Sequence, residues 1–178
     1  KTDVYLGAER NGPGECKADV MISNAGDGTL NWQAIPAQDW IEITPANGSG
    51  DSKIEIGLKH TIFQPGDYTG EIQIRDENAW NSPRLITVHL QIYGAGCSAL
   101  PFGSFDTPLH GSTVISSVPV TGWALDDIGI KSLKIYRDPV SGEGTSLIYI
   151  GDAVFVEGAR PDVESLYPYY PLNYQAGW

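Results

Sequence analysis

The sequence predicts an all-β protein made of two β-sandwiches in tandem, and three observations support this fold class. Apolar and polar residues alternate with a period of two in several short runs, which is typical of strands with one buried and one solvated face. Clusters of Gly, Asn, Asp and Pro separate these runs, and no useful helical period occurs. The 178 residues include 21 Gly and 12 Pro, a content that is normal for a protein with many turns.

Strand signals dominate residues 1–93. The clearest alternation falls at 18–22, 54–58 and 86–92, where Ala, Val, Ile and Leu take every second position. Turn clusters lie between the runs, at 24–28, 45–51, 65–67 and 78–83. Short strands joined by turns of this composition predict an antiparallel sandwich over this half of the chain.

The motifs of this half also carry a resemblance to a known family. In chain order they are SNAGDGTLNW at 23–32, WIEITP at 40–45 followed by GSG at 48–50, PGDYTG at 65–70, and NSP at 81–83 before a Val/Ile strand. This order resembles the BACON domain, a family of immunoglobulin-like sandwiches on exported bacterial proteins, often beside glycoside hydrolases, with a proposed carbohydrate-binding role. The resemblance covers residues 1–93 and implies that Trp32 and Trp40 pack in the core.

A linker and a second module follow. Residues 94–104 have the small-residue and Pro composition of a linker. The rest of the chain resembles bacterial immunoglobulin-like modules, through motifs at 105–108, 118–127 and 160–163, strands at 130–138 and 147–152, and a closing Ala-Gly-Trp at 176–178. Further strands follow that signature in the group. The resemblance therefore implies a second immunoglobulin-like sandwich at 105–178 whose C-terminal strands are missing.

An incomplete sandwich exposes unpaired backbone groups, which are a template for another strand. The stretch 2–8 is a candidate donor between copies, because Val4 and Leu6 alternate with polar neighbours. The alternative assigns Val4 and Leu6 to the first strand of their own sandwich. Truncation of the second sandwich is then only a boundary of this segment.

Charge and hydropathy exclude several classes of partner. Acidic residues exceed basic ones by 22 to 11, and the excess holds in both halves, with 13 against 7 in residues 1–96 and 9 against 4 in 97–178. Binding to phosphate backbones needs the opposite balance, so we expect no nucleic-acid partner. No apolar run approaches the ~20 residues of a membrane span. No signal peptide opens the sequence, so we expect any export signal to have been removed or to lie outside this segment.

No motif for catalysis, a metal or a cofactor is present. The sequence lacks a Gly-x-Ser-x-Gly elbow, a His-x-x-x-His pair and a phosphate-cradling glycine loop, so we predict that this chain is not an enzyme. Several carboxylates in the second half could offer oxygen ligands to calcium, at Asp106, Asp126, Asp127, Asp152 and Asp162. None has the spacing of a known loop motif, and we predict neither a metal site nor a cofactor.

Trp80 is the first candidate for ligand binding. It stands in a polar turn with Asn78 and Asn81, and flat aromatic rings stack on the C–H faces of sugars while polar neighbours take the hydroxyls. An exposed ring here would be a stacking platform. The alternative is that the ring folds back onto the sheet or contacts the second domain.

A second aromatic cluster follows Pro161 on a long loop. It contains Tyr167, Tyr169, Tyr170 and Tyr174 beside two prolines, and rigid tyrosines suit recognition of glycan or protein at low entropic cost. The alternative is a loop that packs onto the sandwich through its own rings.

Two cysteines, Cys16 and Cys97, are too far apart in sequence for a CxxC motif. A disulfide between them is possible in an exported chain, and two unpaired thiols are the alternative. Together these features predict a non-catalytic module of an exported bacterial surface or secreted protein, which binds carbohydrate or mediates adhesion. The alternative is a structural spacer, or a subunit of an extracellular fibre built from copies of the chain or further domains of its parent.

Overall fold

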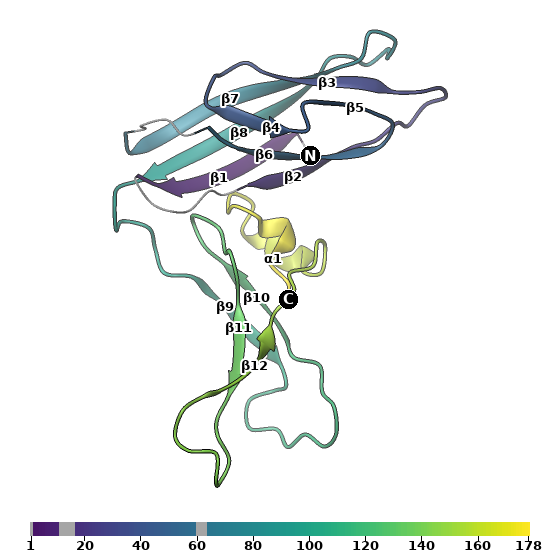
Figure 1. The fold of residues 1–178 in the computed structure, drawn as a ribbon. Helices are drawn as coiled ribbons and strands as arrows, with labels where there is room; N and C mark the ends of the chain where they lie inside the picture. Colours follow the sequence, from purple (N-terminus) through teal and green to yellow (C-terminus); the bar gives the residue numbers. More distant parts are fainter. Residues whose placement is uncertain (1, 11–16, 60–63) are drawn as a thin grey trace. The chain divides into compact units, whose positions relative to one another are not determined.

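A computed structural model describes residues 2–10, 17–59 and 64–178 (Figure 1). The chain divides into two compact units. The N-terminal unit comprises Lys1–Ala99 with two short later segments, Asp127–Gly129 and Tyr169–Leu172. The C-terminal unit comprises Leu100–Asp126, Ile130–Pro168 and Asn173–Trp178. The described residues are nearly all β-strand and loop, as the sequence predicted, with one short α-helix.

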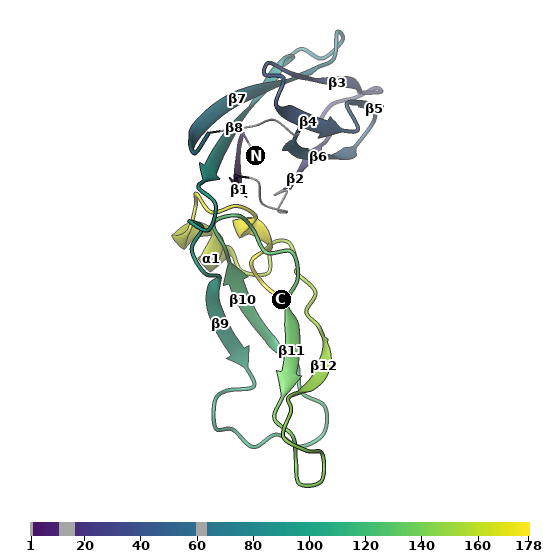
Figure 2. The same cartoon turned by 60° about the vertical axis from the view of Figure 1, so that its left-hand side comes forward.

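The N-terminal unit is a sandwich of two sheets, which Figure 2 shows as separate layers. The larger sheet has the order β1-β8-β7-β3-β5, with bounds Asp3–Glu9, Arg84–Tyr93, Gly66–Arg75, Asn31–Pro36 and Asn47–Ser49. The smaller sheet has the order β2-β6-β4, with bounds Ala18–Ile22, Ser52–Leu58 and Ile41–Thr44. All pairings are antiparallel except β1 with β8, which is parallel.

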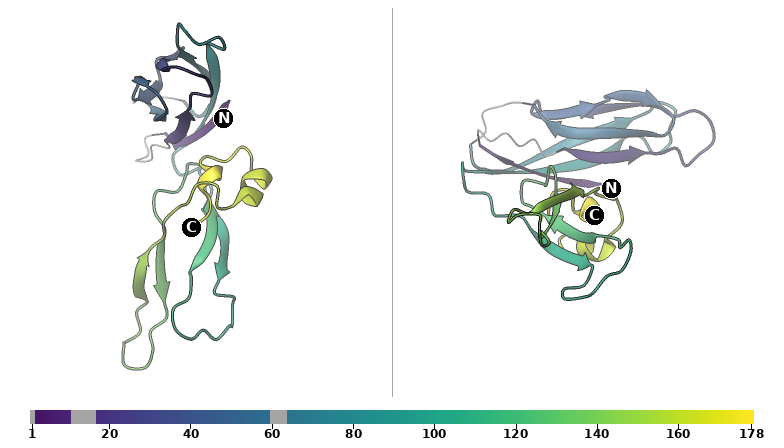
Figure 3. Two further views of the ribbon diagram at one scale, coloured as in Figure 1. Left: turned by 90° about the vertical axis from the view of Figure 1, so that its right-hand side faces the viewer. Right: turned by 60° about the horizontal axis from the view of Figure 1, so that its bottom comes forward.

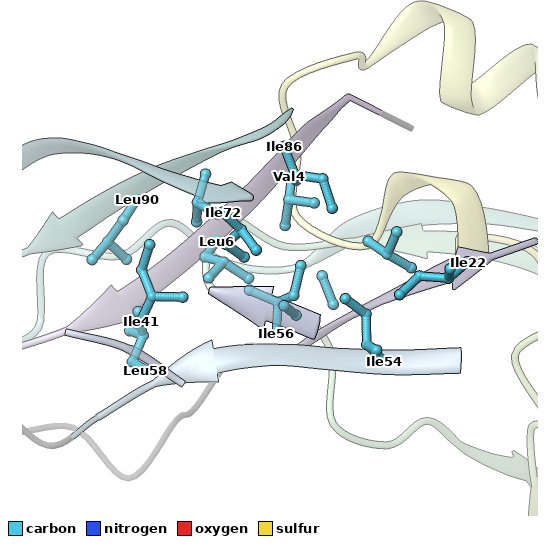
Figure 4. Close-up of a cluster of buried hydrophobic side chains, with 14 of the residues drawn as sticks. Val4, Leu6, Ile22, Ile41, Ile54, Ile56, Leu58, Ile72, Ile86 and Leu90 are labelled. Carbon is cyan, nitrogen blue, oxygen red and sulfur yellow. The ribbon is translucent and has the colours of Figure 1, made fainter. Parts of the chain in front are cut away.

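The core of this unit lies between the two sheets (Figure 4). It is formed by the apolar positions of the alternating runs, such as Ile54 and Ile56 on β6 and Val88 on β8, all of which are fully buried. Trp32 is 1% exposed, and its indole Nε1 donates a hydrogen bond to the carbonyl of Gly50 at 3.3 Å. Trp40 is partly buried against the same cluster. Period-two alternation therefore identified the buried face of each of these strands.

Strand β1 decides between the two interpretations of the N-terminal stretch. Val4 and Leu6 are 4% and 2% exposed, and both belong to the core of their own unit. The strand pairs along its whole length with β8, from Asp3 opposite Thr87 to Glu9 opposite Tyr93. The prediction that residues 2–8 serve as a donor strand is therefore wrong for this structure, because β1 already pairs with β8 in the sheet of its own unit.

The C-terminal unit contains two separate hairpins (Figure 3). Strand β9 (Phe102–Thr107) pairs with β10 (Thr121–Leu125), and β11 (Lys134–Arg137) pairs with β12 (Ile148–Asp152). A short helix, α1 (Pro161–Leu166), and a 3₁₀ turn, η1 (Asn173–Gln175), follow. Gly177 forms isolated bridges to both Trp123 and Val156, so the last residues link the first hairpin to the segment after the second.

This arrangement differs from the predicted boundaries and elements of the second half. Strand β9 begins at Phe102, inside the expected linker 94–104. Helix α1 occupies six residues where a loop was expected, and a proline in its first turn suits a helix start because it has no N–H to satisfy. The described strands form two two-stranded sheets, so the coarse prediction of β structure holds there while the finer immunoglobulin-like topology stays a proposal.

Burial is sparse in the C-terminal unit. Its buried hydrophobic residues among those described are Leu125, Val163, Tyr174 and Ala176. Many of its large apolar side chains are exposed, including Ile115 at 88%, Tyr149 at 51% and Ile150 at 54%. Surfaces of this kind commonly mark sites where another chain or segment packs.

Cys97 carries a free, exposed thiol whose Sγ donates to the carbonyl of Ala95 at 3.8 Å. The possible bridge to Cys16 is thus not formed at Cys97, where the chain makes a tight turn from Gly94 to Cys97. Cys16 itself lies outside the described residues. Across the part of the chain that the structure describes, no helix combines the length and the apolar character needed to cross a membrane.

Candidate functional site

Trp80 lies at the tip of the β7–β8 hairpin and is 95% exposed. The turn that carries it is fastened to the sheet by Asp76, which is 8% exposed. One carboxylate oxygen of Asp76 accepts the backbone N–H of Asn78 at 2.8 Å, and the other accepts that of Asn31 on β3 at 2.6 Å. These backbone donors lower the pKa of Asp76, so the charged form that holds the turn persists well below neutral pH.

The other side of the turn is held as well. The backbone N–H of Asp76 donates to the hydroxyl of Ser82 at 3.0 Å, and the N–H of Ser82 donates to the carbonyl of Ala79. Asn78 and Asn81 are exposed beside Trp80. The structure therefore brings the three predicted residues together, and the ring does not fold back onto the sheet. We name Trp80 with Asn78 and Asn81 the Trp80 tip.

The predicted tyrosine cluster is divided between two surroundings. Tyr167 packs in the C-terminal unit against Phe102 and Trp123, with ring centroids 5.3 and 5.7 Å away. Tyr174 is 7% exposed and lies in the 3₁₀ turn η1. Their prediction as ligand-binding residues is not supported, because these rings serve the packing of their own unit. For them the packed-loop alternative describes the structure.

Tyr169 and Tyr170 belong to the N-terminal unit, where they line a cavity of about 420 Å³. Its floor is the outer face of β1, β8 and β7. The register places Tyr5 opposite His89 and His89 opposite Thr69, which forms one row across the three strands. We name this cavity the tyrosine pocket. Its volume lies within the ~300–1,000 Å³ of typical small-molecule sites.

A second row of the floor runs parallel to the first. Gly7 is opposite Gln91, and Gln91 is opposite Asp67. Because Gly7 has no side chain, the backbone of Asp127 can approach the sheet there, and a β-carbon on Gly7 would clash with the carbonyl oxygen of Asp127. Asp127 is held in turn by its Oδ2, which accepts the backbone N–H of Ala99 at 2.8 Å. The missing side chain at Gly7 therefore lets the backbone of Asp127 form one wall of the pocket.

Ring stacking fixes the centre of the pocket. The rings of Tyr5 and His89 are stacked, with centroids 4.7 Å apart and planes within 10°. Tyr169, which is 73% exposed, meets Tyr5 edge to face at 5.5 Å. Tyr68, Tyr93 and Tyr170 complete the aromatic lining. Such rings supply apolar faces with polar rims, as sugar recognition requires.

The pKa values of Asp3 and Tyr5 are both shifted at this site. His89 Nε2 is 3.0 Å from Asp3 Oδ1, and this hydrogen bond lowers the pKa of Asp3. Burial raises the pKa of Tyr5, and the negative charge of Asp3 adds to the effect. The Tyr5 hydroxyl therefore keeps its proton at neutral pH and can donate a hydrogen bond to a ligand.

The sequence did not single out the floor of the tyrosine pocket. Tyr5, His89, Asp67 and Gln91 are outward-facing residues of alternating strands, and such positions are ordinarily solvated. The feature that brings them together is the pairing of β1 with β8, which joins residues more than eighty positions apart in the sequence. Period-two patterning says which face a residue takes, but not which strand is its neighbour.

No cluster of metal-binding side chains occurs among the described residues. Two of the carboxylates considered for calcium, Asp106 and Asp162, form ion pairs with Arg160. Asp126 is buried at the end of β10, and Asp127 lines the tyrosine pocket. The contacts of Asp106, Asp127 and Asp162 are therefore with other groups of the chain itself.

No protein-family model and no curated protein sequence matches the chain. Among solved structures, 52% of the chain superposes on a Bacteroides ovatus GH5 xyloglucanase in complex with an XXXG heptasaccharide, at 15% identity and a TM-score of 0.41. The match spans 17% of that enzyme's length. Another 12% identical match, with a TM-score of 0.33, covers 49% of this chain and 92% of SSP-19, an MSP-domain-like protein of Caenorhabditis elegans. We base no functional conclusion on similarities this low.

Proposed function

We propose that this chain is a non-catalytic carbohydrate-binding module of an exported bacterial surface or secreted protein. In this proposal residues 1–93 are a BACON-like sandwich and residues 105–178 belong to an immunoglobulin-like module. The observation that carries the proposal is Trp80, 95% exposed at the tip of a hairpin. A solvated indole costs free energy in water, and a ligand that covers it recovers that cost.

The fastening of the tip supports a binding role over simple exposure. The turn is held because the carboxylate of Asp76 accepts the backbone N–H groups of Asn31 and Asn78, and the backbone N–H of Asp76 donates to the hydroxyl of Ser82. A preorganised platform loses little conformational entropy on binding, and so more of the stacking energy appears as affinity. Asn78 and Asn81 place amides beside the ring, where sugar hydroxyls need partners.

Affinity electrophoresis and pull-down on a panel of insoluble and soluble polysaccharides test the proposal. We expect Trp80→Ala to weaken binding to the best polysaccharide about thirtyfold, the result of losing an aromatic hot spot worth ~2 kcal/mol. Trp80→Phe keeps a ring and should recover part of the affinity. Leu85→Ala removes another exposed apolar residue of the same hairpin and is the matched control. Absence of binding across the whole panel contradicts the proposed function.

A structural role is the second candidate, and the C-terminal unit favours it. In the described residues β9 and β12 each pair with a single strand, so each has an outer edge that borders no other strand and lies among exposed apolar side chains. An added strand would pair with that edge and cover those side chains. Because β1 is engaged in its own sheet, the donor in such a fibre would be a strand other than residues 2–8.

Light scattering over a wide concentration range separates the two roles. A fibre subunit should increase in mass with concentration, and Ile150→Lys on β12 should reduce that association. Leu166→Lys, at a position on α1 that is also exposed, is the control. A monomer at every concentration contradicts self-association and leaves carbohydrate binding untouched.

A further inference from the structure

The charge of the tyrosine pocket has one sign. Asp67 and Asp127 are both in the lining, and no lysine or arginine is among its lining residues. Asp3 lies two residues before Tyr5 on the outer face of β1 and is hydrogen-bonded to His89. The net charge of the chain, −11, adds to the same potential. A carboxylate or sulfate on a ligand would be repelled here, whereas a cation would be attracted.

The aromatic rings of the pocket also favour a positively charged ligand. The faces of aromatic rings carry the negative part of their quadrupole and attract ammonium groups within ~6 Å of the centroid. Tyr5 and Tyr169 meet edge to face, so their two rings lie in the lining of the pocket at different orientations. Carboxylates and aromatic faces together are the usual surroundings of a bound ammonium group.

Other lining groups suit hydroxyls. Oε1 of Gln91 accepts a hydrogen bond from the Tyr93 hydroxyl at 2.8 Å. This bond fixes the orientation of the amide NH₂ group of Gln91. The Thr69 hydroxyl lies in the row of Tyr5 and His89. A pyranose ring offers hydroxyls to such donors and acceptors, and a lysine side chain does not.

We propose that the tyrosine pocket binds a sugar residue that carries an unacetylated, protonated amino group. The choice of a sugar rests on the carbohydrate-binding function proposed above, and the site is distinct from the Trp80 tip. The two lie at opposite ends of the β7–β8 hairpin, since the pocket end pairs Asp67 with Gln91 and the tip end pairs Ile74 with Arg84. Asp67 and Asp127 supply the negative potential, and Tyr5 and Tyr169 supply the ring faces.

A series of oligosaccharides with one backbone tests this specificity. Tetramers of β-1,4-linked glucose, N-acetylglucosamine and glucosamine differ only at the second carbon, which bears a hydroxyl, an acetamide or an ammonium group. Calorimetry on the full chain should show the glucosamine tetramer binding at least about tenfold more tightly than the other two. The preference should shrink at high ionic strength, because screening weakens exposed charge interactions.

Variants locate the binding in the pocket. We expect Asp67→Asn and Tyr169→Ala each to weaken binding of the glucosamine tetramer by about fivefold or more. Asp27→Asn makes the same change of charge on an exposed turn of this unit and should leave the affinity unchanged.

The outcomes distinguish this inference from the proposed function. Equal affinity for the three tetramers, or equal weakening by Asp67→Asn and Asp27→Asn, overturns the amino-sugar site while polysaccharide binding at Trp80 still stands. A short lysine peptide that binds more tightly than the glucosamine tetramer would assign the pocket to a protein ligand and overturn the choice of a sugar. If no glycan of any kind binds, both proposals fail.

Discussion

The two units of this chain stabilise their strands in different ways. In the N-terminal unit two sheets face each other across a continuous core that includes Trp32, Ile41 and Ile72, each at most 1% exposed. In the C-terminal unit the described sheets have two strands each, and many of the large apolar side chains face water. Isolated two-stranded hairpins are marginal in water. The comparison teaches that strand content alone does not measure stability, because burial between sheets provides most of it.

What holds the C-terminal unit together is a small cluster around its last residues. The backbone of Trp178 exchanges hydrogen bonds with Gly122, at 2.9 and 3.0 Å, and Ala124 donates to the carbonyl of Ala176. Gly122 permits this, since a β-carbon there would lie 2.6 Å from the ring of Trp178. The contacts join β10 to the end of the chain, and they leave β11 and β12 with little apolar cover.

The largest predicted effect is in the N-terminal core. Trp32→Ala should destabilise that unit by about 3–5 kcal/mol, because it leaves a large cavity between the sheets and removes the indole bond to Gly50. Chemical denaturation followed by circular dichroism measures the change. A loss below about 1 kcal/mol would show that the two sheets do not depend on this ring.

The matching substitution in the C-terminal unit is Leu125→Ala. Leu125 is 2% exposed, but few buried neighbours surround it, so the site can collapse more readily and we expect the lower end of the usual range, about 2 kcal/mol. Hydrogen–deuterium exchange resolved by peptide should show faster exchange in β9 and β10 and unchanged exchange in β6 and β8. Equal losses for Trp32→Ala and Leu125→Ala would remove the contrast between the units.

Local patterns in the sequence predicted much of the N-terminal unit. Alternation placed Ile54, Ile56 and Val88 on the buried face, and the Asn- and Ser-rich turn placed Trp80 at a tip. These features depend on neighbours within a few residues, where periodicity and turn chemistry are informative.

Features that depend on distant pairing could not be predicted in this way. The parallel register of β1 on β8 creates the row of Tyr5 and His89 that floors the tyrosine pocket. Tyr169 and Tyr174 are five residues apart in similar sequence, yet one is 73% exposed and the other 7%. Which of them is buried depends on where the chain turns back at η1, and no local signal marks that turn.

A smaller effect concerns how the Trp80 tip is fastened. Asp76→Asn retains one acceptor oxygen of the two that Asn31 and Asn78 use, so it should lower the thermal midpoint and speed exchange at residues 76–83. Because the pKa of Asp76 is lowered in the folded state, its stabilisation is present above the unfolded value of about 3.9 and is lost as the pH falls through the folded one. The difference between wild type and variant should therefore vanish in strong acid. Glu77→Gln, its exposed neighbour, is the control and should match wild type at every pH.

The smallest effect tests the equivalent turn of the C-terminal unit, where an exposed carboxylate is held mainly by an ion pair. The backbone N–H of Val140 also donates to Oε2 of Glu143, at 2.9 Å. Arg137 binds both oxygens of Glu143, at 2.7 and 2.8 Å, and this pairing lowers the pKa of Glu143 to about 2. The stabilisation is therefore present above the unfolded value of about 4.3 and is lost as the pH falls towards 2. Exposed pairs contribute little and are screened by salt, so Glu143→Gln should change the thermal midpoint less than Asp76→Asn does. High salt should reduce the effect of Glu143→Gln further. Glu157→Gln, an exposed acid of the same unit, is the control. If the effect of Glu143→Gln survives high salt while that of Asp76→Asn does not, the two turns are fastened in the opposite way to the one derived from their contacts.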